Sequence, residues 1–189
     1  MMASILYSAI NTAFTPHLGV FSQSCELMIC GRRYYPEKER ETRYGLFISA
    51  FTPYILPGST IKEAASALSK GLLSAMENRS TFYRSGLLRF LNVWNYMKSF
   101  TEDKEVRNTF EISNLGRVNY TSGSWRVTDA IFSQGVTFAH ITLSVISTPE
   151  GGMNISIAFH DKLLNISQSG VLAMDQCIEE FKKGLLGLE

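Results

Sequence analysis

Residues that build metal centres and disulfide frameworks are scarce in this 189-residue chain, which has three cysteines and three histidines. The cysteines show no C-x-x-C spacing, and the histidines form neither an H-x-x-x-H nor an H-E-x-x-H pattern. These residues are Cys25, Cys30, Cys177, His17, His140 and His160. An odd number of cysteines without that spacing argues against a disulfide framework and a zinc site, and predicts a reducing, cytoplasmic environment. We expect no metal and no covalently bound cofactor.

An excess of charge of one sign is also missing, because 18 basic and 17 acidic side chains leave a formal charge of +1. A chain without a basic field does not attract a polyanion, so we expect no nucleic-acid partner. No apolar run reaches the roughly 18 residues that a membrane span requires. The N-terminus lacks the basic start of a signal peptide. We therefore expect neither a membrane span nor a secretion signal.

Three widespread motifs are absent as well: G-x-S-x-G, the P-loop and G-x-G-x-x-G. Their absence leaves a hydrolase nucleophile, nucleotide hydrolysis and dinucleotide binding without support. What the chain does contain is 45% hydrophobic and 12% aromatic residues, which are spread along its length. That composition predicts a folded core, and the length fits one domain, residues 1–189.

The first half alternates between helical and strand patterns. Apolar residues at helical spacing predict a helix over 2–14, which we expect to end before Pro16. Residues 25–30 and 44–51 are rich in residues that favour strands, and the charged stretch 31–43 between them predicts an exposed connection.

Two helices are predicted next. Thr60 and Glu63 form a T-x-x-E capping box, and apolar residues follow on one helical face as far as Met76. A second helix is predicted from about 82 to 98, where aromatic and aliphatic residues recur every three or four positions. We expect this stripe to lie in the core, with docking on a partner as the alternative.

In the second half the apolar period changes to two, which is typical of strands. The predicted strands are 109–113, 124–127, 136–147 and 153–159. The sequence TPEGG predicts an antiparallel hairpin between the last two, and an amphipathic helix closes the chain. This order predicts an α/β fold, with a mixed sheet covered by helices in a single layered domain.

Three stretches of the second half carry a family resemblance. SNLGR (113–117) is followed by WRVTDAIFSQ (125–134) and then by a hairpin that ends in SIAFHDKLLN (156–165). In this order the stretches resemble the C-terminal half of fungal alcohol acetyltransferases. Those enzymes belong to the coenzyme A-dependent acyltransferase superfamily, together with nonribosomal peptide condensation domains. The similarity extends from about residue 3 to the end of the chain.

The resemblance implies a chloramphenicol acetyltransferase-like fold, in which two similar halves enclose a tunnel. Acyl-coenzyme A enters the tunnel from one face and the acceptor from the other. The family's catalytic motif, HHxxxDG, lies in the N-terminal half, and this chain does not contain it. We therefore expect an acyltransferase half with acetyl-CoA as cosubstrate and a small alcohol as acceptor. Its partner would be a complementing N-terminal half or a second copy in a homodimer.

A second class of function stays open at this point. The chain is also compatible with a noncatalytic binding or interaction protein that kept the fold and self-associates. An exposed apolar face of the sheet would favour this alternative.

His160 is the candidate catalytic residue, because the end of its hairpin corresponds to the place where the other half carries its histidines. Phe159 and His160 would then replace the His-His pair. Leu164 and Asn165 stand at the aspartate and glycine positions of that motif. The alternative is a histidine at a strand end whose polar edge is satisfied by solvent or by Asp161.

The resemblance also implies substrate or coenzyme A binding by polar side chains near the interface of the halves. These residues are Ser113, Asn114, Ser133 and Gln134. They would hold pantetheine amides or polarise an acyl carbonyl. Alternatively, Asn114 and Gly116 form a turn that requires positive φ. Arg117 is compatible with anchoring an anion and with an ordinary solvated position.

Overall fold

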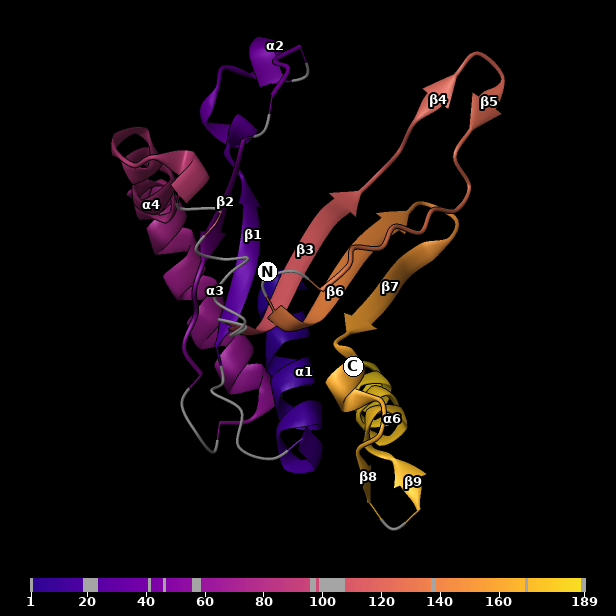
Figure 1. Ribbon diagram of the computed structural model, residues 1–189. Coiled ribbons are helices and arrows are strands. Elements are labelled where there is room, and N and C mark those ends of the chain that lie inside the picture. The colour runs from indigo at the N-terminus through magenta and orange to yellow at the C-terminus, as the bar shows by residue number, and fades with distance from the viewer. Residues whose placement is uncertain are drawn as a thin grey trace.

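The computed structural model describes residues 2–18, 24–40, 42–45, 47–55, 59–95, 98, 108–136, 139–168 and 170–187. Its centre is a five-stranded sheet in the order β2-β1-β3-β6-β7 (Figure 1). The strands are β1 (Cys25–Cys30), β2 (Ile48–Phe51), β3 (Asn108–Arg117), β6 (Ala139–Thr148) and β7 (Gly152–Phe159). β1, β3 and β6 are parallel, whereas β2 and β7 run antiparallel to their neighbours at the two edges. The sheet is therefore mixed, as the sequence predicts.

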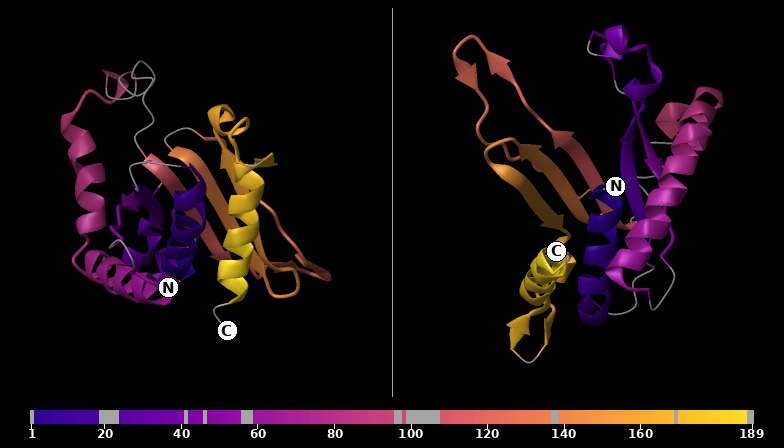
Figure 2. Two further views of the ribbon diagram at one scale, coloured as in Figure 1. Left: turned by 90° about the horizontal axis from the view of Figure 1, so that it is seen from below. Right: turned by 180° about the vertical axis from the view of Figure 1, so that it is seen from behind.

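Three long helices cover one face of this sheet (Figure 2). They are α1 (Met2–Leu18), α3 (Ile61–Glu77) and α6 (Ala173–Leu186). α1 packs against both of the others, which explains why even its small polar residues Ser4 and Ser8 are buried. The result is a two-layer α/β domain with its hydrophobic core between the helices and the sheet.

Shorter elements connect these layers. The helical ones include η1 (Gly31–Tyr34), α2 (Glu37–Arg40), η2 (Ser80–Phe82), α4 (Tyr83–Leu87), η3 (Leu88–Phe90) and η4 (Asp161–Leu163). Two small antiparallel pairs join β4 (Thr121–Ser122) to β5 (Trp125–Arg126), and β8 (Ser167–Gln168) to β9 (Val171–Leu172). The β4–β5 hairpin projects beyond the sheet (Figure 1). No helix in the described ranges is long and apolar enough to cross a bilayer.

The alternation of residues along the strands explains how the core forms. On β3, Phe110 and Ile112 are buried against the helices, and residues of β1 and β6 at matching register join them. The Phe110 ring packs edge-on against two rings of α1, with centroids 6.3 Å from Tyr7 and 6.0 Å from Phe14. These edge-on contacts fix α1 on the sheet.

The predicted start of α3 is confirmed. The Thr60 hydroxyl accepts the backbone N–H of Glu63, and the Glu63 carboxylate accepts the backbone N–H of Thr60 at 3.0 Å. Both bonds satisfy donors that the first turn of a helix leaves open. The predicted hairpin is confirmed too, since β6 and β7 pair in one continuous register from Ile141 opposite Phe159 to Thr148 opposite Gly152.

The end of the first helix differs from the prediction. α1 continues through Pro16 and ends at Leu18. Burial of Leu18 and a 2.9 Å contact between His17 Nε2 and the Glu180 carboxylate of α6 hold this last turn in place. Tertiary packing thus offsets the loss of the helical hydrogen bond that Pro16, which has no N–H, cannot donate.

The predicted helix from 82 to 98 is interrupted at Leu91 and Asn92, with helical residues again at 93–95, and its predicted place in the core is wrong. α4 is only five residues long, and η3 follows it directly. The change to a tighter helix breaks the three-to-four spacing, so the apolar residues do not form one buried face. Phe90 and Trp94 are 69% and 76% exposed. Met97, the last residue of the predicted stripe, lies outside the described residues.

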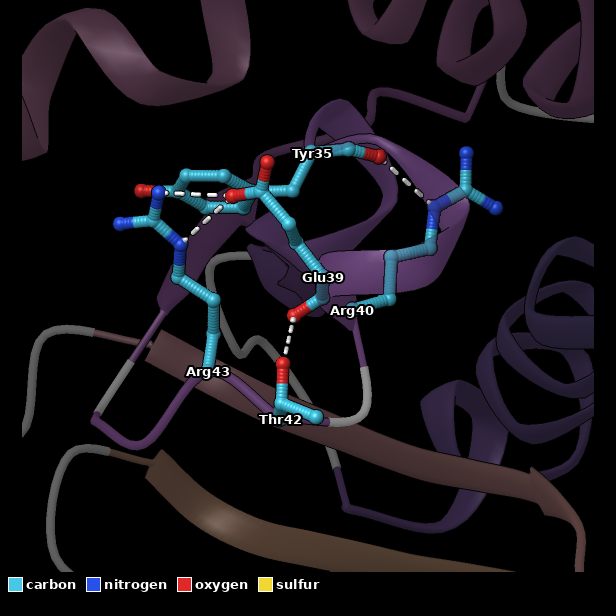
Figure 3. A network of polar contacts seen from close by, with 5 residues as sticks. All are labelled: Tyr35, Glu39, Arg40, Thr42 and Arg43. Carbon is cyan, nitrogen blue, oxygen red and sulfur yellow. Dashed lines mark hydrogen bonds and ion pairs between the residues drawn. The ribbon is translucent and has the colours of Figure 1, made fainter.

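The charged connection after β1 is mostly exposed, as predicted, and several of its side chains bond to other residues of the connection (Figure 3). The Arg43 guanidinium donates to the Glu39 carboxylate at 2.8 Å and lies 4.5 Å from the centre of the Tyr35 ring. Arg40 donates to the backbone carbonyl of Tyr35 at 2.9 Å, and Thr42 donates to that of Glu39. These contacts shape the connection itself.

Two phenylalanines test this division between core and surface. We expect Phe110→Ala to lower the free energy of unfolding by about 3 to 5 kcal/mol, because it empties a packed site between α1 and the sheet. Phe90→Ala, the matched control, should change it by less than about 0.5 kcal/mol. Urea denaturation followed by circular dichroism measures both. A loss for Phe90→Ala comparable to that for Phe110→Ala would contradict the exposure of the 83–95 segment.

Candidate functional site: the polar face of the sheet

The sheet surface opposite the helices carries mostly polar side chains, because they alternate with the core residues along β3, β6 and β7. We call this surface the polar face. Its members are Glu111, Ser113, His140, Thr142, Ser144, Asn154, Ser156 and His160. Ser113, Ser144 and Ser156 are register partners, so three hydroxyl-bearing residues lie in one row across three strands.

Burial divides the polar face into a covered centre and an accessible rim. Glu111, Thr142 and Ser144 at the centre are 8%, 0% and 1% exposed. Ser113 and Ser156 are half-buried, as are the two histidines. A ligand resting on the polar face would therefore meet the serines at the ends of the row and the imidazoles.

Residues 127–136, which contain most of the WRVTDAIFSQ stretch, run along β6 and β7 and are tied to them. Asn154 Nδ2 donates to the Asp129 carboxylate at 2.6 Å and to the Ala130 carbonyl at 2.9 Å. The Thr148 hydroxyl donates to the Thr128 carbonyl at 2.8 Å, and Ser144 donates to Gln134 Oε1 at 3.5 Å. These bonds hold the stretch against the polar face.

Asp129 is the residue in this stretch whose role the sequence did not reveal. Its carboxylate accepts from Asn154 and from the backbone N–H of Ala130. A side chain at Gly151 would collide with that carboxylate, and Gly152 has a φ of +70°. The two glycines of TPEGG thus allow both the hairpin turn and the close approach of Asp129.

The structure brings some predicted site residues together and separates others. Ser113 belongs to the polar face, and Gln134 reaches it through Ser144. Ser133 is exposed on the same segment, and Arg117 is exposed at the end of β3. Asn114 pairs in register with the core residue Val145.

The side chain of Asn114 bonds to the backbone two residues further along the chain. Its Oδ1 accepts the N–H of Gly116 at 2.7 Å, and Gly116 has a φ of +77°. The expected positive φ is therefore present. It lies in an irregularity of strand β3, whose register shifts between Asn114 and Arg117, and not in a loop.

A second histidine joins His160. Because Ile141 is opposite Phe159, His140 is opposite His160, and the His160 N–H donates to the His140 carbonyl at 2.9 Å. The ring centroids are 6.4 Å apart at an interplanar angle of 70°. Counting the strand register back from the TPEGG turn would have predicted from the sequence that His140 lies opposite His160.

The environments of the two imidazoles differ. Burial lowers the pKa of His140, and the nearby His160 and Lys162 lower it further. His160 Nδ1 accepts the backbone N–H of Lys162 at 3.2 Å, at the start of η4. The lowered pKa favours the uncharged form of His140 near neutral pH.

An acid lies at the centre of the polar face. Burial raises the pKa of the Glu111 carboxyl, and the negative charge of its register partner Glu26 raises it further. On the other side, Glu111 pairs with Thr142, whose hydroxyl finds no hydrogen-bond partner within the described part of the chain. Across the described ranges, no three His, Cys, Asp or Glu side chains gather as they would to hold a metal ion.

Replacing this acid tests the raised pKa. A raised folded-state pKa means that the stabilisation from protonated Glu111 is complete below the unfolded-state pKa and is lost as the pH rises through the folded-state value. We expect Glu111→Gln to raise the free energy of unfolding at pH 7, with a gain that shrinks toward pH 4. Urea denaturation at several pH values between 4 and 7 measures this free energy. The control is Glu150→Gln, which replaces an exposed acid paired with Arg126. An equal loss at every pH would contradict the assignment.

Comparisons with known proteins agree with this architecture. The chain is similar to the crystal structure of the epimerization domain from the third module of tyrocidine synthetase B, with a TM-score of 0.56 and 15% sequence identity. That match covers 99% of this chain but 41% of the solved one, so the chain spans less than half the length of that domain. No curated protein matches the sequence. The fold is thus the chloramphenicol acetyltransferase-like fold of condensation domains. Residues 1–184 match the family model for alcohol acetyltransferase, and the chain belongs to the alcohol acetyltransferase family.

Proposed function

We propose that the polar face forms one wall of an acyl-transfer site, which binds acetyl-CoA and a small alcohol acceptor. One observation carries the proposal: the three stretches that resemble the family meet on this face. Ser113 of SNLGR lies next to Ser144, which donates to Gln134 of WRVTDAIFSQ, and the third stretch supplies Ser156 and His160. Residues far apart in the sequence thus surround a single surface.

The chemistry of the polar face suits the neutral part of coenzyme A. Its accessible groups are hydroxyls and imidazoles, which pair well with the amides of a pantetheine arm and with a thioester carbonyl. The phosphates of coenzyme A need cations instead. Exposed Arg117 at the end of β3 is the candidate anchor for such an anionic group.

A complete site needs a second wall. The chain covers 41% of the solved epimerization domain, and it does not contain the HHxxxDG motif. A complementing N-terminal half or a second copy of the chain would face the polar face and enclose the substrates. Acceptor identity and acyl chain length then depend on both walls.

A noncatalytic interaction protein is the second candidate. The observation in its favour is a group of exposed apolar side chains between residues 83 and 95. They are Tyr83, Leu87, Phe90, Leu91, Val93 and Trp94. The sheet surface opposite the helices does not support it, since that surface is mostly polar.

Calorimetric titration of acetyl-CoA into the purified chain tests the proposal. We expect saturable binding, weakened about five- to tenfold by Ser113→Ala, because one net hydrogen bond contributes about 1 kcal/mol. Ser66→Ala, at an exposed site on α3, should leave the affinity unchanged. An absence of binding at millimolar ligand would contradict the proposal, and a stable homodimer in light scattering would then favour the interaction protein.

A further inference from the structure

Strand β7 forms one edge of the five-stranded sheet, and half of its backbone groups point away from β6 (Figure 1). The His160 N–H donates to the His140 carbonyl, which marks a hydrogen-bonded position of the β6–β7 ladder. Such positions alternate along an antiparallel pair with positions that face the other way. Within the described part of the chain, the outward N–H and C=O groups form no hydrogen bond. They belong to Met153, Ile155, Ile157 and Phe159.

This edge lacks the features that usually keep edge strands from pairing. Proteins protect such edges with charged side chains, prolines, bulges or very short strands. β7 is eight residues long, has neither a charged residue nor a proline, and keeps one continuous register with β6. The opposite edge, β2, has four residues, and η2 packs against it. β7 is therefore the edge that favours pairing with another strand.

The side chains of β7 are also only partly covered. Most residues of β6 are buried, whereas no residue of β7 is. Met153 is 40% exposed, and Ile155, Ile157 and Phe159 lie half-buried at the margin of the core. A further strand at this edge would cover the apolar side chains and satisfy the outward backbone groups together.

We propose that β7 pairs with β7 of a second copy of this chain, antiparallel, about a two-fold axis at Ser156. In that register Ile155 faces Ile157 of the second copy, and Met153 faces Phe159, so apolar residues meet apolar residues. Each of these pairs exchanges two backbone hydrogen bonds. On the other surface of the sheet, Ser156 faces its own counterpart.

The strand itself argues for a second copy as the occupant. The register centred on Ser156 is the one in which all four outward-facing residues pair with outward-facing residues, because a shift by one residue leaves one of them beyond the partner strand. The absence of charge removes like-charge repulsion between identical strands. Pairing of one edge with itself closes at two copies, whereas pairing of two different edges would continue without end.

The pairing goes beyond the proposed function and does not depend on it. A two-fold axis perpendicular to a continuous sheet keeps the helices of both copies on one side and both polar faces on the other. The second copy thus lies beside the polar face and not over it. The wall opposite the polar face is then left to a complementing half.

Light scattering of the purified chain at increasing concentration tests the interface. We expect a dimer whose dissociation constant rises at least about tenfold in Met153→Lys, because a lysine on an edge strand opposes pairing. Leu73→Lys, at a 45% exposed site on α3, is the matched control and should leave the dimer intact. Circular dichroism checks that both variants are folded. A monomeric wild-type chain, or a dimer that Trp94→Ser weakens and Met153→Lys does not, would overturn the proposal.

Disulfide trapping tests the register separately. Cys25 and Cys177 are buried, so Ser156→Cys is made together with Cys30→Ser, which removes the exposed thiol. Facing residues at a position without backbone hydrogen bonds have Cα atoms about 4.5 Å apart, which a disulfide can span. We expect mild oxidation to give a covalent dimer.

Ala158→Cys in the same background is the control for this trap. Residue 158 lies on the same side of β7, but the proposed register places it about 14 Å along the strand from its counterpart. It should stay monomeric on a nonreducing gel. Equal cross-linking of the two variants, or none in Ser156→Cys, would overturn the pairing about Ser156.

Discussion

The parallel pairing of β3 with β6 is the constraint on which the rest of the structure depends. It places Phe110 and Ile112 beside Ile141 and Leu143, and this apolar strip receives α1. Because side chains alternate along a strand, the same register places Ser113 beside Ser144 on the opposite surface. A shift by one residue would exchange core and polar face together. The core and the candidate site therefore follow from one set of backbone hydrogen bonds.

Short sequence patterns correctly predicted the elements that short-range interactions determine. The capping box at Thr60 and Glu63, the β6–β7 hairpin and the strand period of the second half all appear in the structure. The residue at which α1 ends and the burial of the 82–98 stripe depend on which elements pack against them. Periodicity alone does not specify those elements. A stripe at helical spacing is buried only where another element covers it.

The candidate site was predicted less completely than the fold. Sequence motifs identified Ser113, Gln134 and His160, which the structure places on or beside one surface. They did not identify His140 as the neighbour of His160, because that pairing depends on the register of a long hairpin. Nor did they separate Asn114 from the site, since its bond to Gly116 depends on a local irregularity in β3.

The central claim is that the polar face holds coenzyme A. Titrating acetyl-CoA into ¹⁵N-labelled protein and mapping the backbone chemical-shift changes tests it most directly. The account predicts saturable changes confined to Ser113, Ser156 and their neighbours on β3 and β7, with α3 unaffected. Changes centred on the exposed 83–95 segment or on the helices, or no changes at all, would contradict it.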